Sequence, residues 1–250
     1  MADLLPPGTT LAGCAVLATA AWHETILIAH MDNAYWLNRW ERQDIGFHQT
    51  EINPYLREFW QRLQLSPASA VLVPLCGKSR DMVWLRQQGH TVLGVELSII
   101  AAQAFFTEHA LVSLDSACDR FTHLAADGIQ VLCGDFFALS REDTAAVSAV
   151  YDRAALVALP PDMRRRYVNH LLQVLPPHTQ ILLITLDYPQ HEMTGPPFAV
   201  SLDEVAALYR SRAEMTVLSQ YDVLAQNPRF QERELSRLEE YVILLKTFAP

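Results

Sequence analysis

Short apolar runs alternate with amphipathic segments along the chain from Ser66 onward. The runs are rich in β-branched residues and predict strands at VLVPL (71–75), TVLGVE (91–96), IQVLC (129–133), VSAVYD (147–152) and QILLITL (180–186). Between them, apolar residues recur every three or four positions, which predicts helices. Strands that alternate with helices in this way predict an α/β fold, in which helices cover both faces of a mostly parallel sheet.

Local signals mark where several of these helices begin and end. Pro54 stands in the first turn of the amphipathic segment PYLREFWQRLQL. Ser79 is the expected N-cap of a helix that stops at Gly89, and Ser98 is the expected N-cap of IIAAQAFFTEHAL. Residues 71–96 therefore read as a β-turn-α-β unit, at the length of about 30 residues that such units have.

Two late β-rich segments break the parallel pattern. MTVLSQYDVL (215–224) and EEYVILLKTF (239–248) follow each other with little helix between them, so we expect an antiparallel hairpin. The chain contains no internal repeat and no long linker. We therefore predict a single domain over residues 31–250, with a helical cap in residues 31–65 and a Rossmann-like core in residues 66–250.

The first 30 residues differ in character from the rest. LAGCAVLATAAW (11–22) resembles the apolar part of a secretion signal, but no Lys or Arg precedes it, and it is shorter than the roughly 20 residues that span a bilayer. The charged, amphipathic pattern of a folded protein begins at Met31. We predict that residues 1–30 are an N-terminal extension, either disordered or translated from an upstream start, with an additional helix as the alternative.

Composition restricts the classes of partner. The 250 residues are 50% hydrophobic and 19% charged, and 19 Lys and Arg against 28 Asp and Glu give a formal net charge of -9. This balance argues against nucleic-acid binding, which requires a basic face, and favours small molecules. The four cysteines lack the spacing of a zinc site or a disulfide framework and suit a reducing cytoplasm; they are Cys14, Cys76, Cys118 and Cys133.

The turn after the first strand contains Gly77-Lys78-Ser79, the last three letters of a phosphate-binding loop. A Walker loop needs a glycine five positions before the GK pair, and Leu72 occupies that position. The dinucleotide fingerprint GxGxxG also fails, because Gly77 is the only glycine in the turn. An ATPase or a nucleotide-binding oxidoreductase is therefore disfavoured.

Glu96 ends the second strand, about 20 positions beyond Gly77. In open α/β sheets an acidic residue at this place commonly accepts hydrogen bonds from ribose hydroxyls, and its charge repels a 2′-phosphate. A solvated carboxylate at a strand end is an equally good interpretation on this evidence alone. The ribose interpretation predicts a nucleoside without a pyrophosphate, and S-adenosyl-L-methionine is the obvious candidate.

Six segments in order carry a resemblance to a known family. They are YWLNRW with GFH (35–48), VLVPLCGKSRDMVWL (71–85), GHTVLGVELS (89–98), CGDFF (133–137), VYDRAALVALP (150–160) and GPPFAV (195–200). Over residues 31–246 the chain resembles the bacterial form of the thiopurine S-methyltransferase family. The resemblance implies the Rossmann-like class I methyltransferase fold, whose sheet has seven mostly parallel strands with the last one antiparallel.

The resemblance also implies which residues hold the cofactor S-adenosyl-L-methionine. They are Trp40 in NRW, Leu75 in PLCGK, Glu96 in GVELS and Arg153 in YDRAAL. An indole face can shield a sulfonium, at about 0.5–2 kcal/mol, and a guanidinium can form a forked pair with the methionine carboxylate. Without the resemblance, Trp40 would more often be a core aromatic residue, and Arg153 a surface or capping charge.

Three further polar residues in or beside these motifs have weaker assignments. Asp135 follows the third strand, where this fold places the adenine. His48 could act as a base, although a lone histidine in a capping segment is more often structural. Asp152 has two possible roles, which are to orient Arg153 or to cap the helix that follows.

The resemblance implies methyl transfer to the sulfur of an aromatic or heterocyclic thiol such as a thiopurine. Arginine cannot act as a base near neutral pH, so we hypothesise that Arg153 and Arg233 steady the acceptor thiolate instead. Family members usually have glycine in the segment RGLS, where this chain has Glu234. If that position has a positive φ, Glu234 strains the turn by about 1–2 kcal/mol.

Two other functions are compatible with the whole chain. Family resemblance also suggests methylation of selenium or tellurium compounds in metalloid detoxification, and a catalytically silent cofactor-binding module is a third possibility. We predict a cytoplasmic monomer that acts on a small thiol or metalloid acceptor, without a metal ion, a nucleic acid or a membrane as partner.

Overall fold

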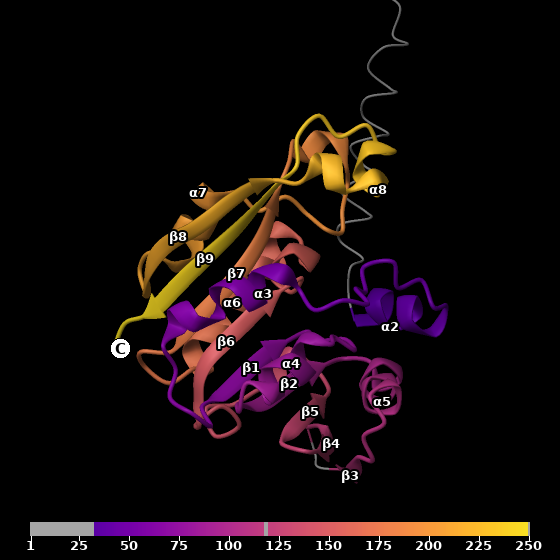
Figure 1. The fold of residues 1–250 in the computed structure, drawn as a ribbon, viewed down its shortest axis with the longest axis vertical. Coiled ribbons are helices and arrows are strands. Elements are labelled where there is room, and N and C mark those ends of the chain that lie inside the picture. The colour runs from indigo at the N-terminus through magenta and orange to yellow at the C-terminus, as the bar shows by residue number, and fades with distance from the viewer. Residues whose placement is uncertain (1–32, 118–119, 250) are drawn as a thin grey trace, which may run out of the picture.

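A single mixed sheet runs through the computed structural model, which describes residues 33–117 and 120–249 (Figure 1). Within these residues the sheet has nine strands in the order β3-β4-β5-β2-β1-β6-β7-β9-β8. Their bounds are β1 Ala70–Pro74, β2 Thr91–Glu96, β3 Leu114–Ala117, β4 Thr122–Ala126, β5 Ile129–Cys133, β6 Val147–Arg153, β7 Gln180–Asp187, β8 Ala213–Asp222 and β9 Glu239–Thr247. The extension predicted for residues 1–30 lies outside the described residues.

The five central strands, from β5 to β7, are parallel, as the alternation of strands and helices predicts. The expected hairpin is confirmed, because β8 pairs antiparallel with β9, and β9 in turn pairs antiparallel with β7. The expected seven strands run from β5 to β8 in spatial order. Antiparallel β3 and β4 add two strands that the sequence did not predict, because residues 114–126 are short, partly exposed segments without a clear apolar alternation.

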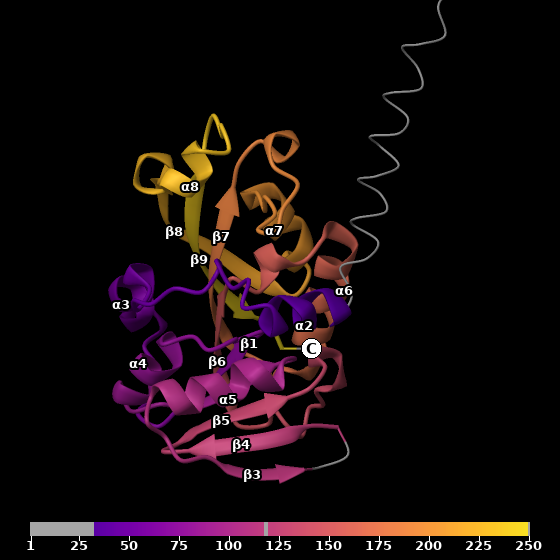
Figure 2. The ribbon, with the colours of Figure 1, turned by 90° about the vertical axis from the view of Figure 1, so that its right-hand side faces the viewer.

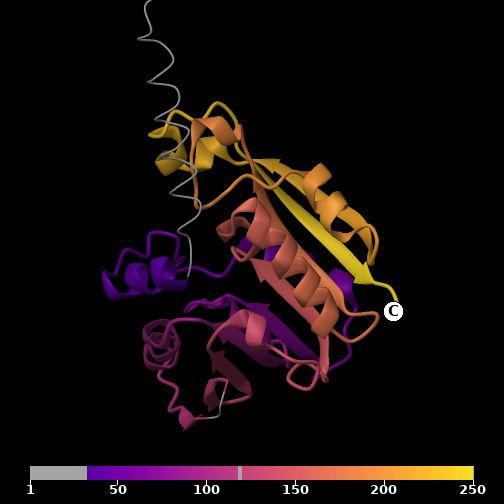
Figure 3. The ribbon, with the colours of Figure 1, turned by 180° about the vertical axis from the view of Figure 1, so that it is seen from behind.

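Helices cover both faces of the sheet (Figures 1 and 3). One apolar cluster joins the sheet to α3, η1, α4 and α5, and a second joins the opposite face to α6 and α7. The bounds are α2 Asn33–Glu41, α3 Pro54–Phe59, η1 Trp60–Leu63, α4 Asp81–Gln87, α5 Ile99–Glu108, η2 Phe136–Ala138, η3 Leu156–Ala158, α6 Pro161–Val174, η4 Gln190–Glu192, α7 Leu202–Tyr209, η5 Leu224–Gln226 and α8 Pro228–Gln231.

The helix starts agree with the sequence signals at two places and differ at a third. Pro54 is the first residue of α3, and the Ser98 hydroxyl accepts a hydrogen bond from the Ala101 amide. The helix α4 begins at Asp81 with Arg80 at the N-cap position, so the prediction of Ser79 as N-cap is wrong by one residue. The Ser79 amide closes a turn on the Cys76 carbonyl, which delays the helix, and the Ser79 hydroxyl still accepts from the Asp81 amide at 3.3 Å.

The helix α2 lies at the edge of one helical layer, beside α5 (Figure 2). The chain that leaves it is tied to α4, because Arg80 donates to the Thr50 carbonyl at 2.9 Å and the Asn53 amide donates to Asp81 at 2.9 Å. These bonds fix the segment between α2 and α3 above the sheet. Among the described helices, none combines the length and the apolar character needed to cross a membrane.

Candidate functional site

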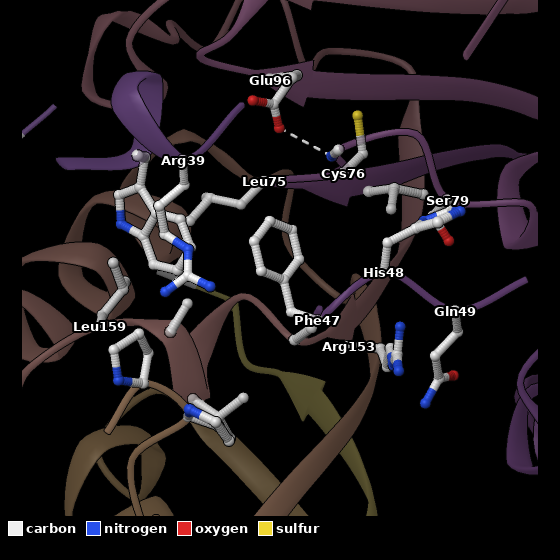
Figure 4. A pocket seen from close by; sticks show the side chains of 18 of the residues that line it. Arg39, Phe47, His48, Gln49, Leu75, Cys76, Ser79, Glu96, Arg153 and Leu159 are labelled. Atoms are coloured by element: carbon white, nitrogen blue, oxygen red, sulfur yellow. Dashed lines mark hydrogen bonds between the residues drawn. The ribbon is translucent and has the colours of Figure 1, made fainter. Parts of the chain in front are cut away.

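A cavity of about 410 Å³ opens where the parallel strands end (Figure 4). Its strand-end side consists of residues at or just after the ends of β1, β2, β5 and β6, namely Leu75, Cys76, Gly77, Glu96, Asp135 and Arg153. Its loop side comes from the loops before α7 and around α8, namely Pro196, Pro197, Asn227, Arg229, Phe230 and Arg233. The cap, which is α2 with the chain up to residue 51, adds Trp36, Arg39, Trp40, Phe47, His48 and Gln49.

All four residues that the sequence assigned to a cofactor line this one cavity. Trp40 comes from the cap, whereas Leu75, Glu96 and Arg153 follow or end three different strands. Parallel strands bring their carboxyl ends to the same edge of a sheet, which explains how residues far apart in the sequence meet here. The fold therefore brings the predicted site residues together.

The turn after β1 has an unusual backbone. Leu75 and Gly77 have φ values of 48° and 52°, in the left-handed region. A Cβ atom on Gly77 would lie 3.2 Å from the Trp40 ring, so the cap packs directly onto the glycine. Both the backbone conformation and the close approach of Trp40 therefore favour glycine at this position.

Lys78 and Ser79 do not form a phosphate cradle. The Lys78 ammonium lies 2.5 Å from the Glu108 carboxylate, in an ion pair between the turn and α5. The Ser79 hydroxyl accepts a hydrogen bond from the Asp81 amide in the turn before α4. Both side chains are thus engaged at the start of the helical layer, which agrees with the rejection of the Walker interpretation.

Glu96 is the most firmly held carboxylate of the strand-end side. It is 6% exposed, and its two oxygens accept hydrogen bonds from the amides of Gly77 and Ser98, both at 2.8 Å. Burial raises the pKa of Glu96, while these amide hydrogen bonds lower it in part. Each carboxylate oxygen has two lone pairs, so Glu96 can accept further hydrogen bonds from a ligand.

Aromatic residues of the cap cover the strand-end side. Trp40 is 4% exposed, and its ring meets the Phe47 ring edge-on, with centroids 5.6 Å apart. Phe47 projects into the cavity (Figure 4). Phe47 was not singled out from the sequence, although it stands in the segment GFH beside His48.

Arg153 ends β6 and points its guanidinium into the cavity (Figure 4). No described carboxylate forms an ion pair with it. Its charge nevertheless reaches two cavity residues, because it adds to the lowering of the pKa of His48 and partly offsets the rise that burial causes in the pKa of Glu240. Arg153 is therefore available to an anionic group of a ligand.

Asp152 does not orient Arg153. Its side chain is fully buried and accepts hydrogen bonds from the Tyr167 hydroxyl at 2.6 Å and from the Leu156 amide at 3.2 Å. Burial raises the pKa of Asp152 to about 6. Its contact with the Leu156 amide lies at the 3-10 turn η3, whereas the predicted helix α6 begins after Pro160 without a side-chain cap, so the capping role expected for Asp152 at that helix is wrong.

Asp135 and His48 both line the cavity. Asp135 lies at the N-cap of η2, where its carboxylate accepts from the Phe137 amide at 2.9 Å. Burial, Lys78 and Arg153 lower the pKa of His48, which favours the neutral imidazole. Within residues 33–117 and 120–249, no group of three His, Cys, Asp or Glu side chains is placed to hold a metal ion.

The loop side depends on a buried arginine outside the cavity. The Arg164 side chain is 2% exposed and donates to the carbonyls of Leu159 and Ala199 at 2.9 and 3.0 Å. It also pairs with Glu204 at 2.6 Å. These bonds join α6 and α7 to the loop that carries Pro196 and Pro197.

The arginines of the loop side have few partners. Arg229 donates to the Gly46 carbonyl and so joins α8 to the cap, while Arg233 contacts the Met193 sulfur at 3.0 Å. Glu234 has a φ of 60°, so the condition for strain at this turn, a positive φ, is met. Arg229 was missed because only the fold brings it to residue 46.

The chain matches a family of known proteins along most of its length. The family model described as Thiopurine S-methyltransferase (TPMT) matches residues 31–247. A thiopurine S-methyltransferase of Nitrosospira multiformis is 57% identical over 217 residues, which are 87% of this chain and 99% of that protein. One of Pseudomonas aeruginosa is 50% identical over 216 residues, 86% and 99% of the two chains.

Solved structures of methyltransferases have the same fold. The 1,6-didemethyltoxoflavin-N1-methyltransferase of Burkholderia thailandensis, with bound 1,6-didemethyltoxoflavin and S-adenosylhomocysteine, has a TM-score of 0.60 at 15% identity and covers 99% of this chain and 95% of its own. A SAM-dependent methyltransferase of Methanosarcina mazei has a TM-score of 0.56 at 13% identity, with 80% and 100% covered. The predicted class I methyltransferase fold is confirmed.

Proposed function

The chain belongs to the thiopurine S-methyltransferase family and is an S-adenosyl-L-methionine-dependent S-methyltransferase, and we propose that its acceptors are aromatic or heterocyclic thiols such as thiopurines. The products are S-adenosyl-L-homocysteine and a thioether. The loop side supports this acceptor class, because Pro196, Pro197 and Phe230 offer apolar surface while Arg229 and Arg233 attract an anionic sulfur.

The geometry of Glu96 carries the cofactor part of the proposal. Its carboxylate is fixed by two backbone amides and keeps lone pairs for a pair of ribose hydroxyls. Leu75 and Arg153 stand beside it in the same cavity, with the guanidinium available for the methionine carboxylate. These donors and acceptors match the ribose and amino-acid groups of S-adenosyl-L-methionine, so the residues present fit this cofactor.

The residues of the cavity act mainly by positioning. When bound, S-adenosyl-L-methionine supplies an electrophilic methyl group. Holding reactants at near-attack distance contributes roughly 7–11 kcal/mol to lowering the barrier, and the cap and the loop side would serve this purpose while excluding water. Arg153 and Arg233 would stabilise an acceptor that is already a thiolate near neutral pH, which makes a dedicated base unnecessary.

Calorimetric titration with S-adenosyl-L-homocysteine tests the cofactor site. We expect the Glu96→Ala variant to bind at least about tenfold more weakly than wild type, because it loses hydrogen bonds to a charged acceptor. Glu142→Ala is the matched control, since Glu142 is exposed and does not line the cavity. A folded wild-type protein without affinity for the ligand would overturn the proposal.

The role of the arginines has a separate test. The rate of methylation of 6-mercaptopurine is measured across pH with Arg153→Met and with Arg233→Met. We expect a lower kcat/KM for the acceptor in at least one variant. Unchanged acceptor kinetics in both variants would remove the electrostatic role.

Two finer predictions also belong to this proposal. We propose a monomer, because one chain supplies the strand-end side, the loop side and the cap of the cavity, and light scattering of the purified protein measures its mass. We also propose a cytoplasmic location, which agrees with the free thiols of Cys76 and Cys133. Fractionation of the cells that produce the protein tests this location.

A further inference from the structure

Glu240 is a carboxylate of the cavity that the proposed mechanism does not use. It lies in β9 between Leu186 of β7 and Tyr221 of β8. It lines the cavity together with Leu186 and with Asn227 of the loop side. A carboxylate at this place faces the part of the cavity that the proposed function gives to the acceptor.

The partners of Glu240 leave it with unused capacity. Tyr55 forms a side-chain hydrogen bond with it, and the Tyr55 ring is fixed by stacking on Tyr221, with centroids 5.0 Å apart and planes at 11°. Among the described residues no Lys, Arg or His forms an ion pair with Glu240. A carboxylate can accept about four hydrogen bonds, so acceptor positions remain for a ligand.

Because Glu240 is partly buried, hydrogen bonds to its free acceptor positions affect its free energy. Desolvation raises the pKa of Glu240, and Arg153 lowers it in part. A partly buried carboxylate without enough hydrogen bonds is costly, and a ligand that donates an N–H removes this cost. An anionic group would instead be repelled by the charge of Glu240.

We propose that Glu240 accepts a hydrogen bond from a ring N–H of the acceptor. The loop side thereby selects heteroaromatic thiols that carry such a donor over carbocyclic thiols that lack one. The inference rests on the proposed function and names its substrate class more narrowly. The cavity is then polarised, because the arginines attract the sulfur and Glu240 receives the nitrogen-bound hydrogen.

The test compares two acceptors, 6-mercaptopurine with ring N–H groups and thiophenol without them. The quantity measured is the ratio of their kcat/KM values. We expect wild type to favour 6-mercaptopurine and Glu240→Ala to lower the ratio by on the order of 10- to 100-fold. Glu240→Gln keeps an acceptor oxygen without the charge and should give an intermediate ratio.

Glu239→Gln is the matched control on the same strand, because Glu239 does not line the cavity and pairs with Arg237 outside it. This variant should leave the ratio within about twofold of wild type, as expected for a charge on the other face of the strand. Melting temperatures identify any variant that loses its fold, and Glu240→Gln, which changes the fewest contacts, then decides the question.

Three outcomes would overturn the inference. They are a wild-type ratio near one, equal losses on both acceptors in a folded Glu240 variant, and a folded Glu240 variant that keeps the wild-type ratio. A variant that instead loses affinity for S-adenosyl-L-homocysteine would assign Glu240 to the cofactor. Failure of wild type to bind that ligand would overturn the proposed function itself, so the two failures are distinguishable.

Discussion

The strand-end side and the loop side of the cavity are held in different ways. Glu96 and the Gly77 turn are connected through backbone amides at the ends of interior strands, and Glu96 is 6% exposed. Arg229 lies in the short helix α8 and Arg233 in the turn after it; both are exposed, and their side chains contact the Gly46 carbonyl and the Met193 sulfur. The first side is fixed by the sheet, whereas side chains of the second can change without disturbing the sheet.

This difference separates two tasks. A cofactor that is the same in every turnover suits a site fixed by the backbone, where substitution has little room. Acceptor choice suits loops, which tolerate variation on a rigid scaffold. If the two sides are independent, a substitution on one side should leave ligand binding at the other side unchanged.

The Arg164→Met variant tests the support of the loop side. It leaves Glu204 and two carbonyls without their donor, so we expect the free energy of unfolding to fall by roughly 3 kcal/mol. The KM for the acceptor should rise, while affinity for S-adenosyl-L-homocysteine stays within about twofold of wild type. Urea unfolding, acceptor kinetics and calorimetry measure the three quantities. Equal losses of affinity for the acceptor and for S-adenosyl-L-homocysteine would show that the two sides are not independent.

The Asp152→Asn variant tests whether burial of the Asp152 carboxylate beneath the strand-end side lowers the stability of the protein. Its native pKa of about 6 lies above the ordinary value of 3.8, so the folded state binds the proton more tightly than the unfolded chain. Its stabilising contribution is complete below pH 3.8 and is lost as the pH rises through about 6. Asp152→Asn should therefore be more stable than wild type at pH 8, by roughly 2 kcal/mol, and should flatten the profile between these values. Urea unfolding across pH checks this; an unchanged profile contradicts it.

The Gly77→Ala variant probes the contact between the cap and the strand-end side. The positive φ costs about 1–2 kcal/mol, and the new Cβ also presses on Trp40, so affinity for S-adenosyl-L-homocysteine should fall about tenfold. Gly89→Ala is the matched control, since Gly89 has a φ of 94° with no atom within 4 Å of an added Cβ. Calorimetry should find its affinity unchanged. Equal losses in both variants would assign the effect to backbone strain alone.

Glu234→Gly has the smallest expected effect. It relieves a φ of 60°, and the gain is partly offset by the greater freedom of glycine in the unfolded chain, so the net stabilisation should be about 0.5–1 kcal/mol. Because Glu234 follows Arg233, acceptor KM should change while the cofactor affinity does not. Thermal unfolding and acceptor kinetics measure both, and a loss of stability would mean that the exposed turn is unstrained.

The two sides also differ in how well the sequence predicts them. Gly77 and Glu96 belong to one β-turn-α-β unit, so their proximity follows from local sequence, and the family resemblance then favours the ribose interpretation over a solvated carboxylate. Arg229 meets Gly46 across 183 positions, and Glu240 faces the cavity only after β9 has inserted between β7 and β8. No local pattern signals such contacts.

The strands and turns also differ in how well the sequence predicts them. Interior strands have long apolar runs and were predicted, whereas β3 and β4 have little apolar periodicity and were not. The conformation at Glu234 was anticipated because a usual glycine is replaced there. The start of α4 was misplaced by one residue because Ser79 is used in a preceding turn.

The position of β3 and β4 bears on how the protein can change over generations. They extend the sheet beyond β5, while β1, β2 and β6, whose ends build the strand-end side, have neighbours on both sides. Leu114 in β3 is 80% exposed, whereas Leu124 of β4 is fully buried in the core, so only the outermost strand meets few packing constraints. Substitutions on β3 can therefore accumulate over generations without disturbing the strand ends that line the cavity.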